Sequence, residues 1–138
     1  MLRYRRDPNP FARGSFGLVF RAHAPDLENR GGYVSGVVAL KSIMLVDQED
    51  EVHAAKEVHF LRLLQGHPQI VKLHDVCCES DMSDKDTGDK RYTKIVLVCE
   101  SCLMSLRDFS RSAAGCPAGW AEHVLGDILQ GMQHVQSH

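Results

Sequence analysis

The chain has 138 residues, of which 43% are hydrophobic and 25% charged, and its formal net charge is −2. Disordered chains are poorer in apolar residues, so this composition predicts one folded domain with a sizeable core. No segment approaches the roughly 18 consecutive apolar residues of a membrane-spanning helix. The near balance of acidic and basic residues does not favour nucleic acid as a partner. We therefore expect neither a membrane nor a nucleic-acid partner.

The cellular compartment is indicated by the first residues and by the cysteines. Three arginines occur among the first six residues without an apolar segment, so we expect no secretory signal peptide. Five cysteines are an odd number, which fits a reducing compartment better than a disulfide framework. We therefore expect an intracellular protein, either cytoplasmic or nuclear.

The first part of the chain predicts an arm followed by strands. Residues 1–10 are rich in arginine and contain two prolines, which predicts an irregular basic arm. Short apolar runs at 18–20 and 37–40 are bounded by turn residues, as strands are. Between them, Gly31-Gly32 is typical of a hairpin turn.

A helix is predicted to follow from Asp47. Acidic residues crowd its start, where they favour the positive end of the helix dipole, and Gly66 with the proline two residues later predicts its end. Residues 70–76 and 95–99 predict two further strands. The polar stretch 79–94 between them predicts a solvated loop or hairpin tip.

Two helices are predicted beyond Cys102, over residues 105–112 and 120–136. The second helix places seven apolar side chains on one face: Ala121, Val124, Leu125, Ile128, Leu129, Met132 and Val135. Burying such side chains contributes about 1.5–3 kcal/mol each. We therefore expect this face to associate with a partner.

The first chemical feature is the turn Ala12–Val19, which contains Gly14 and Gly17 between apolar segments. Glycines allow the backbone to approach phosphate oxygens, so that N–H groups can act as donors. A plain hairpin turn explains the same pattern. A dinucleotide-binding loop is disfavoured, because such a loop begins a helix and this one continues as a strand.

The second feature is Lys41, at the end of the apolar strand, together with Glu57 on the following helix. Glu57 lies beside the apolar positions Leu61 and Leu64 at helical spacings of four and seven. A carboxylate in that position needs a cation to offset its desolvation, and Lys41 is the natural candidate. Two separate solvated surface charges are the alternative interpretation.

Taken together, these segments resemble the amino-terminal lobe of the eukaryotic-type protein kinases. The resemblance covers nearly the whole chain after residue 10, and it rests on segments that occur in the order of the family: the glycine-containing turn, Val38-Ala39-Leu40-Lys41, the helix with Glu57, Gly66–Leu73, Leu97–Glu100 and Ile128–Met132. The resemblance implies an α+β fold, in which an antiparallel five-stranded sheet carries one C-type helix and two helices of an incomplete carboxy-terminal lobe follow. The implied organisation is a basic arm (1–10), an ATP-binding lobe with its hinge (11–102) and carboxy-terminal-lobe helices (103–138).

The resemblance also implies the roles of individual residues. Lys41 and Glu57 would form the ion pair that positions the ATP phosphates. The implied nucleotide-binding positions are Ala12, Gly14, Ser15, Phe16, Gly17, Val19, Ala39, Lys41, Cys99, Glu100, Cys102 and Ser105. Within this set the turn would cover the phosphates, Val19 and Ala39 would enclose the adenine, and Cys99 would be the gatekeeper before the hinge. Ala12 departs from the family, which usually has its first glycine there.

The implied function is transfer of the ATP γ-phosphate to a protein hydroxyl, most similar to the serine/threonine type, with Mg²⁺ bound alongside ATP. The implied partners are ATP and a protein substrate or regulator. The sequence contains no H-R-D and no D-F-G segment, so we expect these 138 residues alone to be inactive.

Two other interpretations remain open. One is a kinase-derived module that binds nucleotide or a protein without catalysis. The other is a metal or redox site, because Cys99 and Cys102 have ligand spacing and Cys77, Cys78 and His74 could join them. A structural zinc site would usually need a second well-spaced cysteine pair, so we expect no metal.

Overall fold

The computed structural model describes residues 4–15, 17–25, 36–80, 92–112 and 115–138. In these residues six strands form one antiparallel sheet in the order β1-β3-β4-β6-β5, with β2 paired to β3. The strands are β1 (Arg5–Arg6), β2 (Ala12–Gly14), β3 (Gly17–His23), β4 (Val37–Met44), β5 (Leu73–Ser80) and β6 (Tyr92–Glu100). The helices that the structure describes are α2 (Gln48–Leu63), α3 (Leu106–Ser110) and α4 (Trp120–Gln136).

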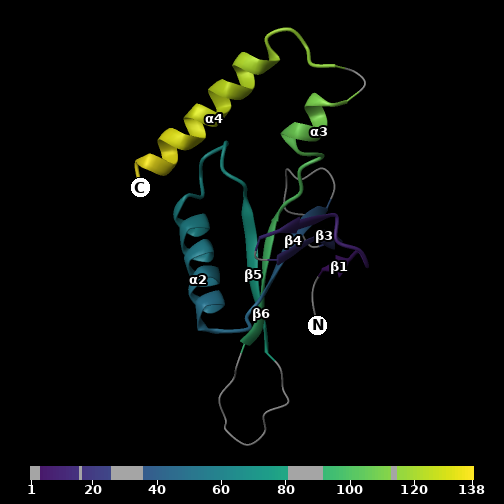
Figure 1. Cartoon of the computed structure of the whole chain (residues 1–138), viewed down its shortest axis with the longest axis vertical. Coiled ribbons are helices and arrows are strands. Elements are labelled where there is room, and N and C mark those ends of the chain that lie inside the picture. The colour runs from purple at the N-terminus through teal and green to yellow at the C-terminus, as the bar shows by residue number, and fades with distance from the viewer. Residues whose placement is uncertain (1–3, 16, 26–35, 81–91, 113–114) are drawn as a thin grey trace, which may run out of the picture.

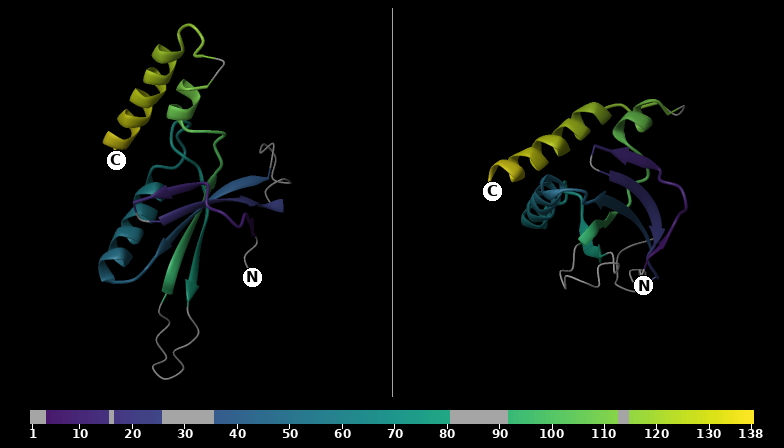
Figure 2. Two further views of the ribbon diagram at one scale, coloured as in Figure 1. Left: turned by 45° about the vertical axis from the view of Figure 1, so that its right-hand side comes forward. Right: turned by 60° about the horizontal axis from the view of Figure 1, so that its bottom comes forward.

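Helix α2 lies beside the sheet, whereas α3 and α4 lie beyond one end of it (Figure 1). The further views place the carboxyl end of α4 near the end of α2 from which β5 continues (Figure 2). The α+β class and the antiparallel sheet that the sequence predicts are therefore confirmed. None of the helices in the described ranges is long and apolar enough to cross a membrane.

The basic arm contains a strand that the sequence pattern did not predict. Arg5–Arg6 pairs with His23 and Ala22 on β3. The guanidinium of Arg6 lies 4.1 Å from the centre of the Phe20 ring, within the range of a cation–π contact. This cross-strand contact accounts for the pairing of an arginine-rich segment with β3. The sheet therefore has one strand more than the five that were predicted.

In the hairpin of β5 and β6, each strand extends further toward the turn than predicted. Both strands extend into the predicted loop, where Glu79 pairs with Lys94 across the ladder. Their side chains form an ion pair at 2.5 Å, so charged residues continue the strands here. Residues 81–91 of the predicted loop, and the predicted turn at Gly31-Gly32, lie outside the described residues.

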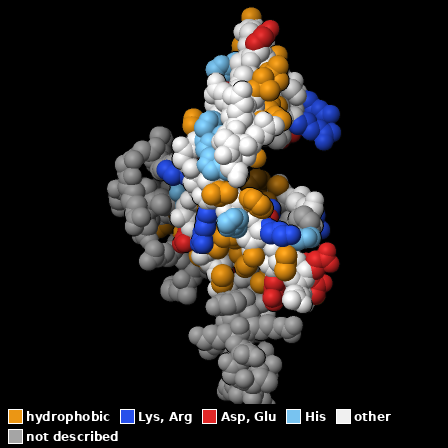
Figure 3. All heavy atoms as spheres, turned by 90° about the vertical axis from the view of Figure 1, so that its left-hand side faces the viewer, with side chains coloured by type: hydrophobic (Ala, Val, Ile, Leu, Met, Phe, Trp, Pro, Cys, Tyr) orange, Lys and Arg blue, Asp and Glu red, His pale blue; other side chains and the backbone are white. Residues whose placement is uncertain are grey.

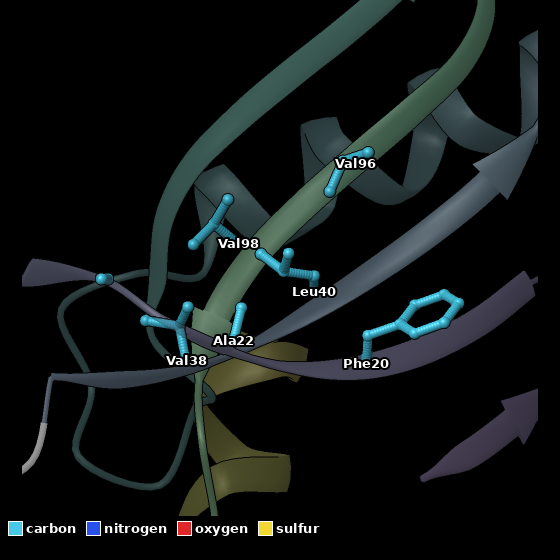
Figure 4. Close-up of a cluster of buried hydrophobic side chains, with 7 residues drawn as sticks. Phe20, Ala22, Val38, Leu40, Val96 and Val98 are labelled. Carbon is cyan, nitrogen blue, oxygen red and sulfur yellow. The ribbon is translucent and has the colours of Figure 1, made fainter. Parts of the chain in front are cut away.

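Alternation along the strands divides the core between the two faces of the sheet. On one face Phe20, Val38, Leu40, Val96 and Val98 form a buried cluster (Figure 4). The opposite face carries a second cluster, which Ala54, Val58 and Leu61 of α2 complete. Its other members are Ile43, Leu97, Leu45, Leu73, Val76, Ile95 and Cys99. The face beneath α2 is the one that carries the predicted site.

Helix α2 begins where the acidic residues predicted it. Asp47 caps the helix by accepting a hydrogen bond from the backbone N–H of Asp50, and the Asp50 carboxylate in turn accepts from the backbone N–H of Asp47. This is a reciprocal capping box. Ala54 is the one buried residue that the structure describes within α2. The partly buried Val58 and Leu61 complete the apolar contact of the helix with the sheet.

Helix α4 is attached to the segment that connects α2 to β5. Nε2 of His134 donates to the Leu64 carbonyl at 3.0 Å, and Nε2 of Gln69 donates to the Asp127 carboxylate at 3.0 Å. The rings of His67 and His134 stack, with their centres 4.6 Å apart. Five of the seven predicted apolar side chains of α4 are 46–57% exposed: Leu125, Ile128, Leu129, Met132 and Val135. Hydrophobic side chains lie at the surface close to histidines (Figure 3).

Candidate functional site

The centre of the candidate site is the ion pair between Lys41 on β4 and Glu57 on α2. Nζ of Lys41 lies 2.5 Å from Oε1 of Glu57. The two side chains are only 28% and 33% exposed, so both charges are partly removed from water. The structure therefore favours the pair over the alternative of two separate solvated charges.

The strand register places further predicted residues on the same face as Lys41. Val19 is paired directly with Lys41, and Ala39 is paired directly with Cys99. Directly paired residues of antiparallel strands project to the same face, and residues two apart on one strand share a face. Val19, Ala39, Lys41 and Cys99 therefore share the face that α2 approaches with Glu57.

Cys99 lies in a partly apolar environment next to this pair. It packs with Leu97 and Leu73 in the cluster beneath α2. Burial, and after it the negative charge of Glu57, raises the pKa of the Cys99 thiol to about 11. Cys99 is thus a neutral thiol at physiological pH and behaves as a small hydrophobic residue.

The glycine-containing turn forms the β2–β3 hairpin. Ala12 pairs with Val19, and Gly14 pairs with Gly17. The structure describes no non-glycine residue with positive φ, so Ala12 occupies an ordinary strand position that needs no glycine. Ser15 is exposed, and Phe16 lies outside the described residues.

The two glycines of the turn have different local environments. A Cβ atom on Gly17 would lie 2.1 Å from the Ser42 carbonyl oxygen, so β3 and β4 can approach this closely only with glycine there. A Cβ on Gly14 would meet the Gly17 carbonyl oxygen at 3.7 Å, an ordinary contact. The packing of β3 against β4 thus requires glycine at position 17 whether or not a ligand binds, whereas it does not require glycine at position 14.

The predicted hinge residues, Glu100, Cys102 and Ser105, contact neighbouring parts of the chain. The Glu100 carboxylate accepts a hydrogen bond from the Lys72 backbone N–H at 2.8 Å, and the Glu100 N–H donates to the Lys72 carbonyl. Ser105 is the N-cap of α3, where its hydroxyl accepts from the Asp108 N–H. Cys102 lines a hollow of about 840 Å³ beneath α4. Cys102 and Ser105 thus lie outside the strands that carry Val19, Ala39 and Lys41.

A second hollow, of about 290 Å³, lies beside the ion pair. It is lined by Ile43, Asp50, His53, Ala54, Lys56 and Glu57. Glu57 therefore borders this hollow as well as contacting Lys41. Sequence reasoning assigned no role to His53 or Lys56, because neither belongs to a recognisable pattern.

Gln65, directly after α2, is a further residue that sequence reasoning missed. Its side-chain amide donates to the Leu61 and Val71 carbonyls at 3.0 and 2.9 Å, and its carbonyl oxygen accepts from the Leu73 N–H at 2.9 Å. These bonds connect the end of α2 to the start of β5. The one signal in the sequence was a glutamine next to the helix-ending Gly66.

The proposed metal or redox cluster is not assembled. Cys77 packs in the cluster on one face of the sheet, whereas Cys99 packs in the cluster on the other. Among the described residues, no three histidine, cysteine or acidic side chains are arranged to hold a metal ion. The ligand-like spacing of Cys99 and Cys102 therefore finds no further ligands in the part of the chain that the structure describes.

No family model matches the chain. It is 28% identical over 134 residues to cyclin-dependent kinase 4 of Mus musculus, an alignment that covers 91% of this chain and 40% of that protein. The Xenopus laevis cyclin-dependent kinase 4 is 27% identical over 128 residues, covering 88% of this chain and 36% of that protein. Myosin-IIIa of Mus musculus is 26% identical over 127 residues, covering 91% of this chain and 7% of that protein.

The chain thus spans less than half the length of the curated relatives that it matches. The α+β fold, with an antiparallel sheet and one helix packed on it, is compatible with the amino-terminal lobe of a kinase. Over most of its length the chain is therefore similar, at low identity, to kinases.

Proposed function

We propose that this chain is the ATP-binding part of a protein kinase of the serine/threonine type. The observation that carries the proposal is the ion pair between Lys41 and Glu57, which joins the sheet to α2 on the face that also carries Val19 and Ala39. A lysine held by a carboxylate presents a fixed cation to phosphate oxygens. The similarity to cyclin-dependent kinase 4 supports the same proposal.

The resemblance to protein kinases assigns roles to several of these residues, and the chemistry of each side chain fits its role. Lys41 would contact the α- and β-phosphates, and Glu57 would hold the ammonium in place. Val19 and Ala39 would provide apolar surfaces for the adenine, and the backbone N–H groups of the turn around Gly14 would donate to phosphate oxygens. Bound ATP would supply the γ-phosphoryl group. We assign no Mg²⁺ ligand to this chain, so Mg²⁺ would enter with the nucleotide.

We further propose that these 138 residues bind ATP without transferring phosphate at a useful rate. The sequence contains neither the H-R-D nor the D-F-G segment that orients the substrate hydroxyl and holds Mg²⁺. Phosphorylation of a protein substrate would belong to a longer, intracellular protein. The division into an ATP-binding region (11–102) and carboxy-terminal-lobe helices (103–138) is part of this proposal.

Calorimetric titration with Mg·ATP tests the proposal. The chain is expected to bind Mg·ATP, and Lys41→Met is expected to weaken binding by at least about tenfold, since a charge-assisted contact contributes about 1.5–3 kcal/mol. Lys56→Met is the matched control, because it removes an exposed lysine from the neighbouring hollow. Equal affinity of the Lys41→Met variant and the unaltered chain would contradict the proposed role.

The second candidate function is a non-catalytic interaction module. The half-exposed apolar face of α4 favours it, because exposed apolar patches mark interaction surfaces. This candidate predicts no heat of binding with Mg·ATP. It would replace the first proposal if the unaltered chain is folded and gives no signal in the same titration.

A further inference from the structure

Helix α2 is held against the sheet by an apolar cluster and by two polar attachments. Ala54 is the one buried residue that the structure describes in α2, and the partly buried Val58 and Leu61 pack into the same apolar cluster. The ion pair of Glu57 with Lys41 attaches the middle of the helix to β4. The side chain of Gln65 attaches the end of the helix to β5. Hydrogen bonds are directional whereas apolar packing is not, so these two polar attachments define the position of α2 along the sheet.

The Gln65 amide uses both of its N–H donors and its oxygen. One donor satisfies the Leu61 carbonyl, which lies in the last turn of α2, where carbonyls lack helical partners. The other donor and the oxygen bind the Val71 carbonyl and the Leu73 N–H. Since β5 is the terminal strand of the sheet, backbone groups on its outer edge have no strand partner. Gln65 thus makes one hydrogen bond to the last turn of α2 and two to residues 71 and 73, where β5 begins.

This connection leads directly to the candidate site. Leu73 is paired with Cys99 on β6, and Cys99 is paired with Ala39 on β4. Ala39 is two residues from Lys41 on the same strand. Glu57 precedes Gln65 by eight residues, or about 12 Å of helix. The bonds of Gln65 to β5 therefore set the distance along the sheet at which Glu57 meets Lys41.

We propose that Gln65 is a positioning residue of the site, which aligns Glu57 with Lys41 by anchoring the end of α2 to β5. The effect on nucleotide binding rests on the proposed function, but the effect on the ion pair does not. Gln65 has no contact with the nucleotide in this account. It acts through Glu57.

Matched variants isolate the hydrogen bonds of Gln65. Gln65→Met keeps an unbranched side chain of similar length but removes all three bonds, and Gln65→Glu keeps an oxygen acceptor but removes both donors. None of Gln, Glu and Met is branched at Cβ, so both variants change the hydrogen bonds and leave the backbone preferences similar. Gln133→Met, on an exposed position of α4, is the control. Circular dichroism establishes whether each variant is folded. If Gln65→Met does not fold, Gln65→Glu takes its place in the measurements.

The first measurement needs no nucleotide. The carboxyl carbon of Glu57 is observed by NMR with and without the substitution Lys41→Met, in the unaltered chain and in each Gln65 variant. We expect Lys41→Met to shift this resonance in the unaltered chain and in Gln133→Met, and to shift it far less in the Gln65 variants. A shift of the same size in the folded Gln65 variants would overturn the inference.

The second measurement uses Mg·ATP. Gln65→Met is expected to weaken binding on the order of fivefold, and this loss is expected to vanish when Glu57→Gln is already present. A loss that persists at full size in the Glu57→Gln background would overturn the inference, because Gln65 would then act by another route. If the unaltered chain does not bind Mg·ATP, the proposed function fails, and the NMR measurement still decides the role of Gln65.

Discussion

Helices α2 and α4 have nearly equal lengths, 16 and 17 residues, but their surfaces differ in polarity. Helix α2 is mixed in polarity, has one described buried residue, Ala54, and lies on the sheet. Helix α4 has a continuous apolar face, yet Leu125, Leu129 and Met132 on that face remain about half exposed. The helix with the weaker apolar stripe is thus the one that packs on the sheet. Helix α2 thus packs on the sheet through a few apolar side chains, Ala54, Val58 and Leu61, together with polar contacts such as the ion pair of Glu57.

The largest expected difference between the two regions is in the cost of removing a leucine. Leu97, beneath α2, is 1% exposed, so Leu97→Ala should lower the free energy of unfolding by about 3 kcal/mol. Leu129→Ala on α4 should cost less than about 1 kcal/mol. Urea denaturation of both variants measures the difference. Similar costs would show that the α4 face is buried in solution, which sedimentation velocity would then reveal as association.

The two glycines of the β2–β3 turn provide the next largest difference. Gly17→Ala should lower the free energy of unfolding by about 1–3 kcal/mol, because its Cβ would overlap the Ser42 carbonyl. Gly14→Ala should change stability by less than about 1 kcal/mol, because its Cβ has room. Thermal unfolding of both variants tests this. Equal destabilisation would contradict the close approach of β3 and β4.

A smaller effect is expected where α4 is attached. His134→Ala removes the hydrogen bond to the Leu64 carbonyl and the stack on His67, which should cost about 1 kcal/mol. Amide hydrogen exchange should then accelerate in α4 and remain unchanged in β4. The control is Gln133→Ala, because Gln133 occupies an exposed position of the same helix. Unchanged exchange in α4 would show that its attachment does not depend on His134.

The smallest effect concerns the thiol beside the ion pair. Because the Cys99 pKa is raised to about 11, its neutral form is favoured in the folded state. Its contribution to stability is therefore present below the ordinary thiol pKa, near 9, and is lost as the pH rises through 11. At pH 8 an alkylating reagent should modify the exposed Cys102 well before Cys99, as mass spectrometry would show. Equal rates would contradict the burial of Cys99.

Local patterns in the sequence predicted much of the fold. The acidic start of α2 at Asp47 and the apolar runs of β3 and β4 are visible within a few residues, because capping and strand periodicity are local properties. The strand at Arg5–Arg6 was missed because it depends on the distant Phe20 ring. The ends of the hairpin were missed because the ion pair between Glu79 and Lys94 joins residues that are far apart in the sequence.

Only part of the candidate site was predictable from the sequence. The motif order identified Lys41 and Glu57, which the structure brings together. Ser105, which the resemblance placed near the nucleotide, caps α3, and the Ser105-x-x-Asp108 spacing could have indicated this. Gln65 could not be predicted, because its partners at Val71 and Leu73 become visible only when the end of α2 is placed against β5.

The most direct test of the account is thermal unfolding of the chain and of Lys41→Met, each with and without millimolar Mg·ATP. A ligand that binds only the folded state stabilises it by about 2.7 kcal/mol at a hundredfold excess over Kd. We predict one cooperative transition that Mg·ATP shifts upward in the unaltered chain, and a much smaller shift in Lys41→Met. A cooperative transition that Mg·ATP leaves unchanged in the unaltered chain would contradict the central claim.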